Sequence, residues 1–274
     1  MNASHDPGLA VCLASSFCGY HAHAGFLNEL DRCGWRPGRI AGSSAGALAG
    51  GLWAAGIRGE ALERLFRSWK MKWAFIDALA IPRFILLPSA WGSSGVLSGK
   101  PLRRFLKRWI GDRRIEDLDA PSLDLAVFNL AKARGEIVRE GPLAEFIAAS
   151  LAVPMLFAAQ EIDGEWFVDG GVTNETPFEQ WLDDPAVHTI LVHTIRHQSP
   201  GERTRWSPGA VTASVHSVTA GEAFRRRRKL AEASGKRVHF LETRTPSPGL
   251  FQGKRAGALI EAGRATVAAW ASRE

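Results

Sequence analysis

The chain has 274 residues, of which 46% are hydrophobic and 23% are charged, and its formal net charge at pH 7 is +6. This composition excludes wholesale disorder and a coiled coil, and the length suits one large domain with a substantial core. The positive charge favours anionic partners, which include nucleic acid and anionic lipid surfaces. Charge alone does not choose between these two.

The cysteines and the apolar segments bear on the compartment. Cys12, Cys18 and Cys33 are odd in number and few for the length, so we expect reduced thiols rather than a disulfide framework. The first residues lack the basic start and apolar run of a secretory signal, and no apolar run reaches the roughly 18 residues of a membrane span. We therefore expect a cytoplasmic protein that meets a membrane only at its surface.

Two strand-to-helix units open the chain. The segment GLAVCLASSF begins at Gly8 as a buried strand, and apolar residues at helical spacing predict a helix over 22–33. A second short strand ends near Ala41, and a second helix begins at about Ala45. This succession predicts an α/β domain with a mostly parallel, buried sheet.

The middle of the chain alternates amphipathic helices with an interrupted apolar segment. Apolar residues three and four positions apart predict one helix across 62–73 and another across 98–111. The apolar stretch 71–91 is broken by Pro82 and Pro88, so we expect a packed loop, a lid or an interfacial segment there.

The second half predicts further strands and a helical tail. LDLAVFNLA and GEIVREG read as two strands joined by a turn, and GPLAEFIAASLAVPMLF as a helix that Pro154 ends. Asp163-Gly164 marks the turn of a hairpin, HTILVHTI is a strand, and a mostly helical segment follows over 208–274. We expect residues 1–274 to form a single domain with its core at about 8–200.

Residues Gly42-Ser43-Ser44-Ala45-Gly46 match G-x-S-x-G between a predicted strand and a predicted helix. A nucleophile elbow needs small residues two before and two after its serine, because the tight turn leaves no room for side chains there. The helix that starts at Ala45 would present backbone N–H groups and a positive dipole end to a developing oxyanion. Glycines at this spacing also allow close helix packing, which is the alternative explanation.

The serine needs a base, and two arrangements compete. In the first, the base is Asp169 of FVDGGV, followed by Gly170 and Gly171, which allow another loop to approach closely. In the second, a histidine completes a Ser, Asp, His order like that of α/β-hydrolases. The candidates for that histidine are His188, His193 and His197.

Three blocks in this order give the chain a specific resemblance. They are the loop before HAGFLNEL, the elbow GSSAG, and ASLAVPMLFAAQEIDGEWFVDGGVTNETP with its D-G-G. The chain resembles patatin-like phospholipases, lipid acyl hydrolases that use a Ser-Asp dyad without a catalytic histidine. The resemblance implies a three-layer α/β/α sandwich with a helical C-terminal tail, Ser44 as the nucleophile, Asp169 as the base and an acyl lipid or ester as substrate.

The chain departs from that family in the loop that forms the oxyanion hole. The family pattern G-G-G-x-R/K-G aligns with Ser15, Ser16, Phe17, Cys18, Gly19 and Tyr20, in which glycine remains only at position 19. Either the loop shifts register and Ser16, Phe17 or Cys18 supplies the N–H donors, or the hole is impaired. Two alternative functions therefore stay open: a Ser-His-Asp esterase or thioesterase, and a catalytically weak lipid-binding module.

The remaining motifs bear on partners. No H-E-x-x-H, C-x-x-C or EF-hand pattern occurs, and GSSAGALAG lacks the lysine of a phosphate-binding loop, so we expect neither metal nor cofactor. Basic side chains cluster at two places without any nucleic-acid module, so we expect no nucleic acid and propose transient contact with an anionic membrane surface. The two clusters are Arg103, Arg104, Lys107 and Arg108, and the run RRRRK at 225–229.

Overall fold

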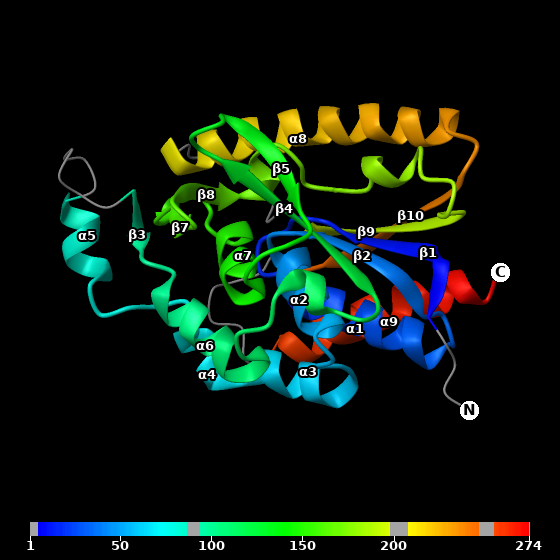
Figure 1. The fold of residues 1–274 in the computed structure, drawn as a ribbon, viewed down its shortest axis with the longest axis horizontal. Coiled ribbons are helices and arrows are strands. Elements are labelled where there is room, and N and C mark those ends of the chain that lie inside the picture. The colour runs from blue at the N-terminus through cyan, green and yellow to red at the C-terminus, as the bar shows by residue number, and fades with distance from the viewer. Residues whose placement is uncertain (1–4, 87–93, 198–207, 247–254, 274) are drawn as a thin grey trace.

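The computed structural model describes residues 5–86, 94–197, 208–246 and 255–273, and they form three layers. A twisted sheet crosses the middle of the molecule, with α1, α2 and α9 on one face and α8 on the other (Figure 1). The bounds of these helices are Tyr20–Arg32 for α1, Ala45–Ala54 for α2, Pro208–Ala233 for α8 and Ala256–Ala271 for α9.

In the described part of the chain, the sheet has eight strands in the order β10-β9-β1-β2-β4-β8-β7, with β5 also paired to β4. The strands from β10 to β4 are parallel, whereas β5, β8 and β7 join antiparallel, so the prediction of a mostly parallel sheet is confirmed. The strands are β1 (Asp6–Leu13), β2 (Pro37–Ser43), β4 (Ser122–Asn129), β5 (Arg134–Val138), β7 (Gln160–Ile162), β8 (Glu165–Asp169), β9 (Thr189–His197) and β10 (Arg237–Thr245).

Burial on both faces of the sheet explains why the central strands consist mostly of apolar residues. The stretch 9–13 of β1 is almost completely buried, because helices cover the parallel sheet from both sides. Leu13 pairs with Gly42 of β2 and with His193 of β9, and Ser43 pairs with Ala126 of β4. The carboxyl ends of four neighbouring strands therefore lie side by side at one edge, where α/β folds place their ligands.

The prediction of one continuous helix across 62–73 is wrong. The segment is divided into α3 (Gly59–Arg67) and α4 (Trp69–Ala74), with Ser68 between them in an extended conformation. The Ser68 side chain accepts the N–H of Met71 at 3.2 Å, so it caps the second helix. The apolar spacing continues through Ser68 without a break, so the spacing alone does not show that one helix ends there and another begins.

The interrupted apolar stretch contains α5 (Ala80–Leu86), while positions 87–91 lie outside the described residues. Next come β3 (Gly95–Leu97) and α6 (Lys100–Ile110), and α6 confirms the predicted amphipathic helix. The helix α7 (Leu143–Ser150) ends before Pro154 is reached, and β6 (Met155–Phe157) then pairs with β3 in a small parallel sheet. The hairpin of β7 and β8 turns at Asp163-Gly164, as predicted.

The C-terminal segment contains a strand where the sequence predicts mostly helix. Residues of RVHFLETRT form β10, which pairs with β9 in parallel along its whole length. The helix α9 then packs closely on α1: a Cβ at Gly263 would lie 2.0 Å from the Ala22 carbonyl oxygen, and one at Gly25 would lie 2.0 Å from that of Ile260. Glycine at both positions lets the two backbones approach.

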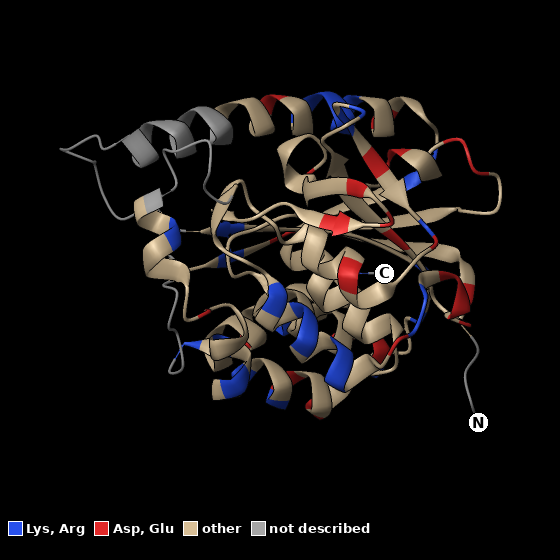
Figure 2. Cartoon of the chain, turned by 60° about the vertical axis from the view of Figure 1, so that its left-hand side comes forward, with Lys and Arg blue, Asp and Glu red and all other residues tan. Residues whose placement is uncertain are grey.

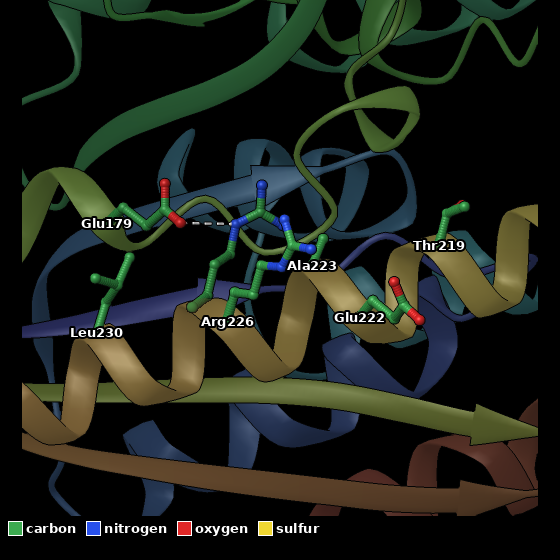
Figure 3. A pocket seen from close by; sticks show the side chains of 7 residues that line it. Glu179, Thr219, Glu222, Ala223, Arg226 and Leu230 are labelled. Atoms are coloured by element: carbon green, nitrogen blue, oxygen red, sulfur yellow. Dashed lines mark hydrogen bonds and ion pairs between the residues drawn. The ribbon is translucent and has the colours of Figure 1, made fainter.

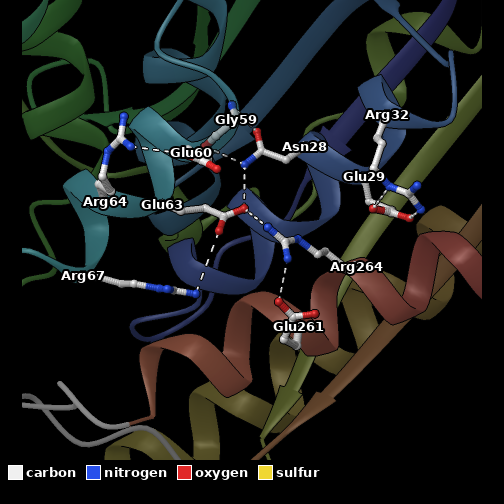
Figure 4. A network of polar contacts seen from close by, with 10 residues as sticks. All are labelled: Asn28, Glu29, Arg32, Gly59, Glu60, Glu63, Arg64, Arg67, Glu261 and Arg264. Carbon is white, nitrogen blue, oxygen red and sulfur yellow. Dashed lines mark hydrogen bonds and ion pairs between the residues drawn. The ribbon is translucent and has the colours of Figure 1, made fainter.

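A polar network fastens α9 to α1 and α3 beside this contact (Figure 4). The nearly buried Glu63 carboxylate accepts from the Arg264 guanidinium and from Asn28 Nδ2, the latter at 3.0 Å. Arg264 also pairs with Glu261 at 2.6 Å. The C-terminal helix is thus held by charge pairing as well as by apolar burial.

Candidate active site

Ser44 occupies the tight turn between β2 and α2. Its backbone has φ 51° and ψ −116°, a conformation that a non-glycine residue adopts only when its surroundings impose it. A Cβ at Gly42 would lie 2.5 Å from the Gly46 carbonyl carbon, and one at Gly46 would lie 2.1 Å from the Leu13 carbonyl oxygen. The turn therefore has no room for side chains at either motif glycine, as the pattern predicts.

The elbow is supported from below by a serine that the sequence analysis did not find. Ser150, the last residue of α7, is fully buried. Its hydroxyl accepts the N–H of Ser44 at 2.9 Å and donates to the carbonyl oxygen of Ala126 at 2.7 Å. This bridge fixes the strained peptide before Ser44 between α7 and β4. No motif marks Ser150, which stands in the sequence as one serine among apolar helix residues.

The end of β8 brings a carboxylate to the serine from 125 positions away. Ser44 Oγ donates to Asp169 Oδ2 at 2.7 Å, and Asp169 Oδ1 accepts the N–H of Gly171 at 2.7 Å. Both side chains are nearly buried, at 6% and 4% exposure. Gly170 permits this approach, because a Cβ there would lie 2.2 Å from the Ala126 carbonyl oxygen.

Burial changes the acid–base character of this aspartate. Desolvation raises the pKa of Asp169 to about 7, against the opposing effect of the hydrogen bonds from Ser44 and Gly171. The nearby Glu175 adds a smaller increase to this pKa. A carboxylate with a pKa near neutrality is a stronger proton acceptor than an exposed aspartate, which suits a general base.

The histidines of the competing arrangement make other contacts. His188 precedes β9, and its Nε2 lies 3.8 Å from Asp6 Oδ1 at the start of β1. His197 ends β9, and its Nδ1 lies 2.8 Å from Thr245 Oγ1 on β10. Within the described residues, the side-chain partner of the Ser44 hydroxyl is Asp169 rather than a histidine.

His193, the third candidate, is completely buried in a pair with His23 of α1. Their Nδ1 atoms are 2.8 Å apart, His23 Nε2 lies 2.9 Å from the Ala14 carbonyl oxygen, and His193 Nε2 lies 2.7 Å from Thr243 Oγ1. Burial lowers the pKa of both rings, to about 4 for His23, so the pair is neutral at pH 7. A carbonyl oxygen can only accept a hydrogen bond, so His23 Nε2 donates to Ala14. This bond holds Ala14 in place, and Ala14 directly precedes the loop 15–19 that departs from the family pattern.

The altered loop runs over 15–19 and reaches the same edge of the sheet. The N–H groups of Ala14 and Ser15 already donate to the carbonyl oxygens of His193 and Glu175, at 3.0 and 2.7 Å. Cys18 adopts φ 54°, which a glycine would adopt at no cost.

Several N–H groups around the elbow have no acceptor among the described residues. They are those of Ser16, Phe17 and Cys18 in the loop and of Ala45 in the first turn of α2. The Ser44 N–H does not belong with them, because it donates to Ser150. A Cβ at Gly171 would lie 2.6 Å from Ser15 Oγ, so the loop and the D-G-G turn also lie against each other.

A separate hollow of about 390 Å³ lies along α8 (Figure 3). Arg227 is one of its lining residues, and its guanidinium donates to Glu179 Oε1 and to the Thr173 carbonyl oxygen, both at 2.9 Å. These two bonds hold α8 against the segment after β8. Neither Ser44 nor Asp169 lines the hollow, so the hollow is not part of the candidate site. It is lined by Glu179, Thr219, Glu222, Ala223, Arg226, Arg227 and Leu230.

The serine and the aspartate both fall in a region shared with known proteins. A family model described as patatin-like phospholipase matches residues 11–182, which contain Ser44, Asp169 and most of the sheet. The chain belongs to the patatin-like phospholipase family. The family resemblance that the GSSAG and D-G-G blocks indicate is therefore confirmed.

Relatives of this patatin-like chain include uncharacterized NTE family proteins of Mycobacterium tuberculosis and Mycobacterium bovis. Each is 30% identical to it over 233 residues. The alignment covers 82% of this chain but 62% of the relative, so the chain spans less than two thirds of the length of these proteins.

Solved structures with the same fold include VipD from Legionella pneumophila and the type III effector protein ExoU. VipD gives a TM-score of 0.53 at 13% identity, over 99% of this chain and 68% of VipD. ExoU gives 0.50 at 12% identity, over 98% of this chain and 53% of ExoU. At these identities the likeness concerns the fold, and it confirms the α/β sandwich.

Proposed function

We propose that this patatin-like chain is a serine hydrolase that cleaves fatty acyl ester bonds of phospholipids or related lipids, with Ser44 as nucleophile and Asp169 as general base. The observation that carries the proposal is the 2.7 Å contact between Ser44 Oγ and Asp169 Oδ2 on a strained G-x-S-x-G turn. Family membership supports lipid hydrolysis as the class of reaction.

The proposed reaction proceeds through an acyl-enzyme. Ser44 Oγ attacks the ester carbonyl carbon while Asp169 Oδ2 takes the hydroxyl proton, which gives a tetrahedral oxyanion. The carbon–oxygen bond to the alcohol then breaks, and the alcohol leaves with the proton from Asp169. Water attacks the acyl-enzyme, Asp169 accepts a proton from that water, and Ser44 recovers a proton as the fatty acid departs.

The oxyanion needs donors, and the altered loop limits which groups can serve. We assign this role to the N–H groups of Phe17 or Cys18 together with that of Ala45, since these groups have no acceptor among the described residues. The positive end of the α2 dipole lies at the same place. Loss of one such donor costs roughly 2.7–4 kcal/mol of transition-state stabilisation, so the loop decides between a working and a nearly silent enzyme.

The raised pKa of Asp169 gives an expected pH profile. The base must be ionised to accept the Ser44 proton, so kcat/KM for a soluble ester is expected to fall on the acid side of about pH 7 and to level off above it. Each pH unit below the pKa should lower kcat/KM about tenfold. A rate profile with p-nitrophenyl butyrate measures this, and a plateau extending down to pH 5 would contradict the assignment of Asp169 as base.

Covalent labelling tests the proposed nucleophile directly. The protein is exposed to a fluorophosphonate and examined by intact-mass and peptide mass spectrometry, with turnover of a medium-chain p-nitrophenyl ester measured alongside. We expect one adduct on Ser44, and neither adduct nor turnover in Ser44→Ala. Folded protein that gives no adduct and no turnover, with or without lipid vesicles, would instead support a catalytically idle lipid-binding module.

A further inference from the structure

Large apolar side chains are exposed on α4, on α5 and in the turn that joins these two helices. Ile81 is 75% exposed and Ile85 is 70% exposed, where side chains of this kind are usually buried. We call this set the α4–α5 apolar surface. It consists of Trp69, Trp73, Leu79, Ile81, Phe84 and Ile85.

The two short helices present these residues on single faces. Ile81, Phe84 and Ile85 are three and four positions apart on α5, and Trp69 and Trp73 are four apart on α4. Residues on other sides of α4, such as Met71 and Ala74, are buried. On α4 the two tryptophans are therefore the outer side of a packed helix, while on α5 the half-buried residues are Ala80 and Arg83.

The position of α5 is fixed by polar contacts on its inner side. Arg83 Nη1 donates to Asp77 Oδ1 at 2.6 Å, and Asp77 Oδ2 accepts from both the N–H and the hydroxyl of Ser98 at 2.8 Å. These bonds tie α5 to the segment after β3. Figure 1 shows α5 and β3 projecting from one end of the molecule. The Asp77 carboxylate thus joins α5 to the segment after β3, and the apolar side chains of α5 stay exposed.

Basic side chains lie on α4 and on the neighbouring helix α6, where Lys107 pairs with Asp112 and Glu145. Helices α4 and α6 pack against each other, and Figure 2 shows Lys and Arg gathered over the lower helices of the molecule, which include both. None of the other basic residues concerned forms an ion pair with another described residue. They are Lys70 and Lys72 on α4 and Arg103, Arg104 and Arg108 on α6.

The apolar surface continues toward the candidate active site. The helix α5 packs on β3, whose Gly95 pairs with the exposed Met155 of β6. Val153, two positions earlier, is also exposed, and the carbonyl oxygen of its neighbour Ala152 accepts the N–H of Asp169 at 2.9 Å. An acyl chain that follows these side chains would arrive beside the dyad.

We propose that the α4–α5 apolar surface seats the protein on an anionic lipid bilayer. Tryptophan side chains favour the headgroup level, the apolar face of α5 suits the boundary with the acyl chains, and the unpaired Lys and Arg side chains match anionic headgroups. In the described part of the chain no helix is long and apolar enough to cross a membrane. A second copy fits this face less well, because two such sets of basic side chains would repel each other.

The role of this contact in delivering substrate rests on the proposed hydrolase function, whereas the contact itself does not. The first test is co-sedimentation at low salt with vesicles of phosphatidylcholine and phosphatidylglycerol. The double variant Phe84→Ser/Ile85→Ser is compared with Val218→Ser/Leu230→Ser, a matched control on α8 whose side chains are 60% and 56% exposed. We expect the α5 variant to lose at least about tenfold in vesicle partitioning and the α8 control to keep it.

The second test separates charge from apolar contact. Arg104→Glu/Arg108→Glu on α6 is compared with Arg225→Glu/Lys229→Glu on α8, both against vesicles with and without phosphatidylglycerol. We expect the α6 variant to lose the dependence of binding on the anionic lipid and on salt, while the α8 variant retains both. Equal losses in the two variants would mean that overall charge, rather than this surface, drives binding, and would overturn the proposal.

Turnover of a soluble short-chain ester, measured on the same proteins, distinguishes the two proposals. Soluble turnover with no vesicle binding would overturn the membrane surface and leave the hydrolase intact. Vesicle binding through α5 with no turnover would support the membrane surface and overturn the proposed hydrolase function. A wild-type dimer by light scattering that becomes a monomer in Phe84→Ser/Ile85→Ser would show a contact between copies and would also overturn the proposal.

Discussion

Asp169→Asn is expected to lower kcat for a soluble ester by about 10²–10⁴-fold, the range that a positioned general base contributes. The amide cannot take a proton from Ser44 Oγ, although its size and shape match those of the carboxyl group. The buried position strengthens the effect, because Asp169 is 4% exposed and bulk water reaches it poorly. Steady-state kinetics between pH 6 and pH 9 measure the loss, and the fall in rate below about pH 7 should disappear with it.

The control for this prediction is one of the three histidines that the sequence leaves open for a Ser, Asp, His order. His188→Gln alters a half-exposed side chain at the start of β9, away from the carboxyl edge of the sheet, and should keep wild-type turnover. Circular dichroism melting establishes that each variant is folded. Full activity in Asp169→Asn, or loss of activity in a folded His188→Gln, would refute the Ser-Asp assignment.

Local patterns were enough to predict the two strand-to-helix units that open the fold, β1 with α1 and β2 with α2. Buried runs such as 9–13 and the glycines after them mark each passage from strand to helix, because strands covered on both faces are apolar throughout. The sequence pattern also explains the elbow, since Gly42 and Gly46 leave no space for a side chain. Asp169 came from the resemblance to a family, because spacing alone left a histidine equally open.

Elements that depend on distant neighbours were missed. The strand β10 reads as ordinary polar-rich sequence, and it becomes a strand by pairing with β9. Ser150 acts only after α7 has folded against the elbow, and His23 meets His193 across 170 positions of sequence. Three-residue strands such as β3 and β6 are too short to show a period. These features arise from tertiary contacts, which a single sequence does not display.

Gly46→Ala is expected to destabilise the protein by about 1–3 kcal/mol and to lower turnover as well. The new Cβ would lie 2.1 Å from the Leu13 carbonyl oxygen and 2.6 Å from its carbonyl carbon, and Leu13 is a fully buried residue of β1. The N-terminus of α2 must then move away from β1, and Ser44 moves with it. Urea unfolding followed by tryptophan fluorescence measures the stability, and ester turnover measures the displacement.

Substitutions at two other glycines are the controls. They distinguish a G-x-S-x-G motif that serves close helix packing from one that positions Ser44. Gly221→Ala lies on α8 with nothing within 4 Å of its Cβ, so it should gain about 0.5–1 kcal/mol of stability from helix propensity and leave turnover unchanged. Gly50→Ala would press only on the side-chain tips of Ile40 and Leu13, at 2.9 and 3.1 Å. If the glycines serve packing alone, turnover should fall with stability equally at Gly46 and Gly50. A loss of turnover at Gly46 that exceeds the loss at Gly50 for the same loss of stability would show that this glycine holds Ser44 against Asp169.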